Sequence, residues 1–157
     1  FIVTIDDGYL NNYEIAYPLL QEMQLHADIF CVVQDLSGGR NSHFTYDQAR
    51  EMEESGYVKV YSHNIDHIDC TTVSGPEFNR ELERAYESLR SALGAKELFF
   101  AYPYGSYNTS TYVNVRDNGF RLQMVQKRLF AADDILVRQN VWYTSNMASL
   151  VKKAPKN

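Results

Sequence analysis

Hydrophobic residues along the chain alternate between short continuous runs and a spacing of three or four residues. Short apolar runs are typical of buried strands, and the wider spacing is typical of helices that pack one face against a sheet. The runs predict strands at residues 1–5, 27–33, 58–61, 98–101 and 120–125, with a weaker one at 135–138. The spaced positions predict helices at residues 11–23, 45–56, 76–93 and 109–118. Repeated strand–helix units predict a parallel sheet with helices packed outside it, as an open sheet or a barrel.

Local signals at the predicted helix ends agree with this division. Thr45 and Gln48 have the spacing of a capping box, in which each side chain bonds the backbone of the other residue. Pro76 suits the first turn of a helix, and Gly94 and Gly119 suit the positions that end one. The helices are therefore expected to begin and end close to the bounds given above.

Length and charge exclude some classes of protein. A chain of 157 residues has the size of one domain, and we expect residues 1–157 to form a single domain. The net charge of −5 and the pI near 5.3 argue against a nucleic-acid partner, because phosphate recognition needs a clustered excess of Lys and Arg. No run approaches the roughly 18 apolar residues of a membrane-spanning helix. A neutral or cationic partner fits this composition better.

The start of the chain and its cysteines bear on the cellular compartment. The sequence begins without Met inside a predicted strand, so we expect the natural protein to continue upstream with a signal peptide, an anchor or more of the domain. Cys31 and Cys70 are too few for a disulfide framework and are expected to be free thiols, although their pairing stays open. Neither feature decides the localisation.

Three polar clusters follow predicted strands directly. They lie at residues 6–8, 62–67 and 103–105. Because catalytic groups of parallel sheets and barrels gather at the carboxyl ends of the strands, we expect these clusters to lie close together.

The first two clusters have the composition of a metal site. Asp6 and Asp7 point to opposite sides if the strand continues, so they can have different roles, although paired acids before a glycine also describe a surface turn. His63 and His67 can converge in a tight turn, and their alternative is a pair of solvent-facing loop histidines. Two imidazoles and one carboxylate with a fourth position open to water form the hydrolytic zinc arrangement. Calcium or magnesium sites would not recruit two histidines.

The remaining candidate groups carry weaker signals. The turn at residues 102–105 could aim a backbone N–H into the site. The other two histidines, His26 and His43, are expected to be structural or exposed. Most aromatic residues are expected in the core, and Trp142 is interpreted as core or as the wall of a sugar subsite.

Together these residues resemble the polysaccharide deacetylase family, carbohydrate esterase family 4, also called the NodB homology domain. Its motif Thr-Phe-Asp-Asp-Gly is similar to residues 4–8, with Ile for Phe. Its motif His-Ser/Thr-x-x-His is similar to residues 63–67, with Asn64 in place of the hydroxyl residue. Its motif Arg-x-Pro-Tyr is similar to residues 101–104, with Ala101 in place of Arg. Within the family, the chain most resembles the branch that deacetylates poly-N-acetylglucosamine.

The resemblance implies an irregular, incomplete (β/α) barrel and a metal-dependent hydrolase. It implies that Asp7, His63 and His67 bind one divalent ion, most simply Zn²⁺, with Co²⁺, Mn²⁺, Ni²⁺ or Fe²⁺ as alternatives. It implies that Asp6 is the general base and that Tyr104 donates a backbone N–H to the oxyanion. The substrate would be an N-acetylated glucosamine polymer of a cell wall or biofilm, contacted by Pro103 and Tyr104, and the protein would act outside the cell or at its surface.

Two departures from the family pattern leave alternatives open. With Ala101, the positive charge that orients the base must come from elsewhere or be absent. No histidine follows His67 to serve as general acid, and the resemblance implies that the natural protein carries one upstream of Phe1. One alternative is a metal- and sugar-binding relative with impaired catalysis. Another is an amidase that acts on a small amide or cyclic imide.

Overall fold

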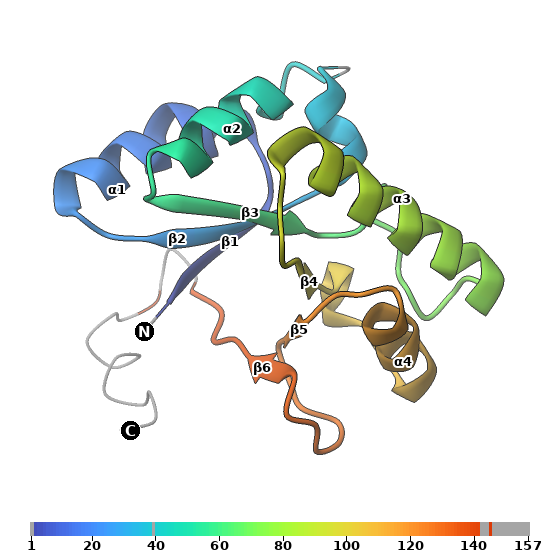
Figure 1. Cartoon of the computed structure of the whole chain (residues 1–157). Helices are drawn as coiled ribbons and strands as arrows, with labels where there is room; N and C mark the ends of the chain where they lie inside the picture. The colour runs from blue at the N-terminus through green and yellow to red at the C-terminus, as the bar shows by residue number, and fades with distance from the viewer. Residues whose placement is uncertain (1, 39, 142–144, 146–157) are drawn as a thin grey trace.

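A single curled sheet forms the centre of the protein. The computed structural model describes residues 2–38, 40–141 and 145, and all strands named here are parallel. Their order is β1-β2-β3-β4-β5-β6, with β1 and β6 at the two edges (Figure 1). The strands are β1 (Val3–Asp7), β2 (Ala27–Cys31), β3 (Val58–Ser62), β4 (Phe99–Ala101), β5 (Leu122–Val125) and β6 (Ile135–Val137). The sheet is thus a half-barrel, which confirms the predicted incomplete (β/α) barrel.

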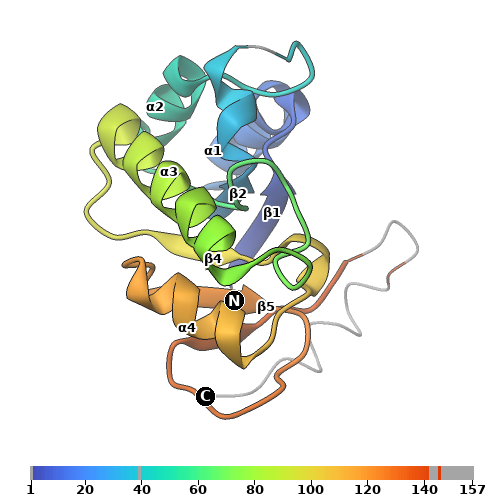
Figure 2. The ribbon, with the colours of Figure 1, turned by 90° about the vertical axis from the view of Figure 1, so that its right-hand side faces the viewer.

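Helices cover the outer face of this half-barrel. Helices α1, α2 and α3 lie over β1 to β3, and α4 lies beside α3 next to β5 (Figures 1 and 2). The helices are η1 (Asn12–Ala16, a π-helix), α1 (Tyr17–Met23), η2 (Val33–Ser37, a 3₁₀-helix), α2 (Tyr46–Glu54), α3 (Gly75–Leu93), η3 (Pro103–Gly105, a 3₁₀-helix) and α4 (Thr109–Asp117). Within the described residues, none of them is long and apolar enough to cross a membrane.

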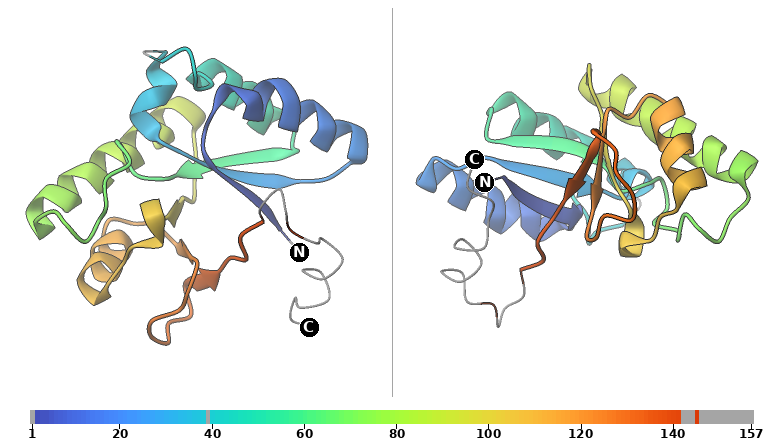
Figure 3. Two further views of the ribbon diagram at one scale, coloured as in Figure 1. Left: turned by 180° about the vertical axis from the view of Figure 1, so that it is seen from behind. Right: turned by 90° about the horizontal axis from the view of Figure 1, so that it is seen from below.

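The sheet divides the apolar side chains into two clusters. The larger cluster lies between the outer face and the helices and includes Ile29, Val60 and Phe100, all fully buried. A small second cluster consists of Phe30, Ala101 and Met124, with Tyr61 and Phe99 packed against it. Since side chains alternate along a strand, neighbours such as Ile29 and Phe30 necessarily face opposite sides. The inner face of the half-barrel therefore has its own aromatic lining. Figure 3 shows the curl of the sheet from behind and from below.

Most predicted elements are present, with shifts at their ends. The first strand continues through the two acids to Asp7, whereas the sequence placed its end at Ile5. The second ends at Cys31, because residues 33–37 turn into a 3₁₀-helix. Thr45 and Gln48 form the predicted capping box, with hydrogen bonds of 2.8 and 3.3 Å.

Both cysteines are free and buried, as predicted, and burial raises the pKa of both thiols. Trp142 lies outside the described residues.

The register brings the carboxyl ends of the first three strands to one level. Asp7 pairs with Cys31, and Cys31 pairs with Ser62. Because His63 follows Ser62 directly, it begins its loop at the same edge of the sheet as Asp7. The predicted convergence of the polar clusters thus follows from the strand pairing itself.

Gly8 makes the turn after Asp7 possible. Its φ is +83°, and an added Cβ would lie 2.7 Å from the Cβ of Cys31. We expect Gly8→Ala to lower the free energy of unfolding by roughly 3 kcal/mol, because overpacking adds to the cost of a left-handed conformation. Gly38 is a matched control, since it has the same φ of +83° and nothing within 4 Å of an added Cβ. Its replacement by Ala should cost only about 1 kcal/mol in urea unfolding, and equal losses would contradict this account.

Candidate metal centre and active site

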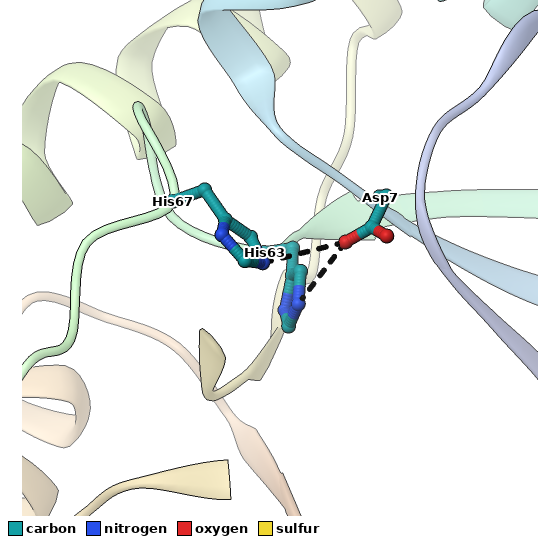
Figure 4. Close-up of side chains that lie close together, drawn as sticks. All are labelled: Asp7, His63 and His67. Carbon is teal, nitrogen blue, oxygen red and sulfur yellow. Dashed lines mark ion pairs between the residues drawn. The ribbon is translucent and has the colours of Figure 1, made fainter. Parts of the chain in front are cut away.

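Three side chains converge at the carboxyl edge of the sheet. The Oδ1 atom of Asp7 lies 3.6 Å from Nε2 of His63 and 3.4 Å from Nε2 of His67 (Figure 4). Each residue offers one ligand atom, and the three atoms lie within 4.8 Å of one another. Asp7 comes from the end of β1, and both histidines come from the loop after β3. The structure therefore brings together the three residues that the sequence predicted as metal ligands.

The hydrogen bond of His63 fixes its tautomer. Its Nδ1 lies 2.7 Å from the carbonyl oxygen of Ala101, and a carbonyl can only accept, so Nδ1 carries the proton. Nε2 is then left with its lone pair directed toward Asp7 and His67. Burial lowers the pKa of His63, against the opposing effect of the nearby Asp6 carboxylate, and so favours the neutral ring. A neutral imidazole held from its other nitrogen is the usual form of a metal-binding histidine.

The backbone around the cluster adopts conformations that non-glycine residues rarely adopt. Five such residues in the described chain have positive φ, and four belong to this edge of the sheet: Asp7 (72°), Asn64 (70°), His67 (59°) and Tyr104 (61°). Left-handed conformations cost such residues free energy and tend to collect at functional sites. The strain is consistent with loops shaped to aim their side chains at one point.

The donor set fits a borderline divalent cation. Ligand atoms about 2.1 Å from a tetrahedral ion lie roughly 3.4 Å apart, close to the two separations from Asp7 Oδ1. Two imidazole nitrogens and one carboxylate oxygen suit zinc and its neighbours in the first transition row better than calcium or magnesium. A fourth position would remain open for water or substrate. The residues present can thus hold a catalytic metal ion.

Asp6 is not among the three clustered ligand residues and forms an ion pair with Arg138. The Nη1 of Arg138 donates to Oδ1 of Asp6 at 2.5 Å, and Nη2 donates to Oδ2 at 2.7 Å. The guanidinium also lies 3.3 Å from Oγ1 of Thr4 and above the ring of Phe30, 5.4 Å from its centroid. Its side chain is only 12% exposed. This two-point contact orients the carboxylate and links the two edge strands of the half-barrel.

Arg138 is the residue that the sequence analysis missed. With Ala101, the chain lacks the arginine of the third family motif that would orient the predicted base. Arg138 instead brings a guanidinium to Asp6 from the other edge of the sheet. One signal could have found it. Arg138 follows β6 directly, where the rule about polar residues at the carboxyl ends of strands applies as it does after β1 and β3.

The third polar cluster also reaches the site. The ring of Tyr104 packs edge-on against His67, with centroids 4.8 Å apart, and its side chain is 66% exposed. Pro103 is buried and lies in η3, which suits a role in shaping the turn. The contacts of both residues with substrate stay predictions.

The other two histidines lie away from the cluster. His26 is exposed and stacks on Tyr57, with centroids 5.5 Å apart. His43 is buried, and its Nε2 lies 3.6 Å from the carboxylate of Asp35. Both contacts agree with the structural roles predicted for these residues.

The chain is similar to known proteins in both sequence and fold. A family profile described as polysaccharide deacetylase matches residues 1–123. YxkH of Bacillus subtilis (strain 168), whose name proposes a polysaccharide deacetylase, is 28% identical over 121 residues. The match covers 77% of this chain and 42% of YxkH, so the chain spans less than half of that relative.

Solved structures show the same fold. A de-N-acetylase from Aggregatibacter actinomycetemcomitans superposes with a TM-score of 0.85 at 20% identity, over 96% of this chain and 73% of that one. IcaB from Ammonifex degensii superposes with a TM-score of 0.80 at 27% identity, over 90% of this chain and 67% of that one. The chain therefore shares its fold with these two solved structures.

Proposed function

Because the chain belongs to the polysaccharide deacetylase family, we propose that it is a metal-dependent hydrolase that removes N-acetyl groups from a glucosamine-containing polysaccharide. The convergence of Asp7, His63 and His67, next to an Asp6 held by Arg138, is the observation that carries this proposal. Cell-wall and biofilm polymers are the substrates that we favour, and action outside the cell follows from that choice.

Asp7, His63 and His67 would hold the ion, and we favour Zn²⁺. When bound, such an ion supplies a Lewis acid for the acetamide carbonyl and lowers the pKa of a coordinated water. Asp6 accepts the proton of the attacking water at its carboxylate, as a general base. Arg138 holds that carboxylate in its orientation through two hydrogen bonds. The backbone N–H of Tyr104 donates to the oxyanion that develops on the carbonyl oxygen.

The alternative that the protein is a catalytically impaired relative of the deacetylases loses part of its support. It depended on a missing arginine and a missing general acid, and the contact of Arg138 with Asp6 removes the first reason. The small-amide alternative keeps the same ligands and base and differs only in how the substrate is bound. The exposed ring of Tyr104, which packs against His67, favours a sugar polymer, because pyranose rings stack on aromatic faces.

Acetate release tests the proposal directly. We expect the protein to release acetate from N-acetylglucosamine oligomers after loading with Zn²⁺, Co²⁺ or Ni²⁺, and to lose that activity after treatment with a chelator. Activity should return when the metal is added back. The control is a small cyclic imide under the same conditions. Hydrolysis of the imide with no release of acetate would favour the amidase and contradict the proposal.

A further inference from the structure

Tyr9 lies on the turn that follows β1, close in sequence to the metal ligand Asp7. It follows Asp7 by two residues, and its side chain is 47% exposed. The ring stacks on His43, with centroids 4.8 Å apart and an interplanar angle of 28°. Since His43 covers one face, the opposite face of the ring is the one available to solvent.

A buried polar network supports the covered face. The Nε2 of His43 lies 3.6 Å from Oδ2 of Asp35, and its Nδ1 lies 3.0 Å from Oγ of Ser42. Asp35 also forms an ion pair with Arg40, whose Nε lies 3.1 Å from Oδ1 of Asp35, and the side chains of His43 and Asp35 are both 6% exposed. Burying such a pair costs desolvation that an apolar contact would avoid. The network is therefore better explained by the orientation it gives the ring than by stability alone.

Backbone hydrogen bonds also hold the segment of Tyr9 against that of His43. Tyr9 and His43 form an antiparallel bridge. On either side of it, the N–H of Leu10 donates to the carbonyl of Ser42 at 2.8 Å, and that of Phe44 donates to the carbonyl of Gly8 at 3.2 Å. A ring fixed in this way loses little conformational freedom when a ligand stacks on it.

The position of Tyr9 suits an extended ligand. Tyr9 follows β1, the metal-binding loop follows β3, and the exposed ring of Tyr104 follows β4. Strands β1 and β4 are three inter-strand spacings apart, roughly 14 Å before the curl of the sheet is considered. A chain of sugar rings laid across this edge would span the strand ends that carry Tyr9 and Tyr104, whereas a small amide would not reach both.

We propose that Tyr9 is a stacking platform for a pyranose ring of the polymer, outside the position where the acetamide is hydrolysed, and that the Asp35–His43 pair positions it. This inference rests on the proposed function and adds a specificity-determining residue to it. The face of an aromatic ring is electronegative, so it attracts the C–H groups of a sugar and the ammonium of a glucosamine unit that has already been deacetylated. Tyr9 would thus favour polymers over single sugars and small amides.

Binding of N-acetylglucosamine hexamers, in β-1,4 and β-1,6 linkage, tests the platform on the metal-loaded protein. We expect Tyr9→Ala to weaken binding of at least one hexamer about tenfold, and Tyr9→Phe to keep it. Affinity for the monomer should be unchanged. Tyr57→Ala is the matched control, since Tyr57 also stacks on a histidine but lies at the opposite end of the sheet, before β3. Titration calorimetry measures the affinities of wild type and the three variants for each of the three sugars.

A double variant tests the positioning role of His43. His43→Gln should weaken hexamer binding in the wild-type background and add nothing to Tyr9→Ala. Equal hexamer affinity of Tyr9→Ala and wild type would overturn the platform, as would a wild type that binds neither hexamer. If wild type still releases acetate in either case, the proposed function stands. If metal-loaded wild type releases no acetate from any oligomer, the proposed function itself fails.

Discussion

Zinc should no longer bind stoichiometrically to a His67→Ala variant. The side chain of His67 is 30% exposed, so its removal should leave the fold intact, whereas the side chain of His63 is only 4% exposed and leaves a cavity when truncated. Loss of a residue that merely supports a ligand costs about 10–100-fold in metal affinity, so loss of a ligand should cost at least about 100-fold. Elemental analysis after dialysis measures the metal content, and acetate release should fall with it.

His26→Ala is the matched control for this experiment. His26 is exposed and contacts Tyr57, so its variant should retain one metal ion per chain. His63→Ala should lose the ion as His67→Ala does. Circular dichroism checks that each variant is folded. Full metal occupancy in folded His63→Ala or His67→Ala would remove these residues from the ligand set.

Local sequence patterns predicted the elements well because each signal acts within a few residues. Thr45 caps its helix through Gln48, three positions away, and Gly94 ends the long helix α3 with a φ of +66°. The metal cluster was predictable for a related reason. Strand pairing brings the carboxyl ends of β1 and β3 to one edge, so residues that follow those strands must lie close together.

Contacts between residues far apart in the chain could not be predicted from such local patterns. Arg138 and Asp6 are 132 residues apart in the chain, and their ion pair depends on how far the sheet curls. Apolar periodicity does not specify that curl. The contact of Tyr9 with His43 likewise depends on a pairing of two loops, residues 8–10 and 42–44. No sequence motif predicts this pairing. The histidine expected upstream of Phe1 as general acid stays a prediction.

Replacing Asp6 by Asn should lower turnover roughly 100-fold or more while the metal stays bound. Asn cannot accept the proton of the attacking water, which is the contribution expected of a positioned general base. Asp6 contacts Arg138 and not the cluster of Asp7, His63 and His67, so the amide should leave the ion in place. Turnover of an acetylated oligomer and elemental analysis of the same sample give the two readouts. Unchanged turnover would remove Asp6 from the mechanism.

Turnover of an acetylated oligomer also shows whether Arg138 acts through Asp6 or on the substrate directly. If the guanidinium acts only by orienting Asp6, then Arg138→Met should lower turnover about tenfold in the wild-type background. It should add almost nothing to Asp6→Asn, because residues that act as a unit are not additive. Arg138→Lys should recover part of the loss, since an ammonium keeps the charge but not the two-point contact. Removing Arg138 also removes the link between β1 and the end of β6. Thermal unfolding of each variant shows how much of the lost turnover comes from lost stability. Losses that multiply in the double variant would show that Arg138 contacts the substrate or the oxyanion by itself, and its role as the partner of the base would be wrong.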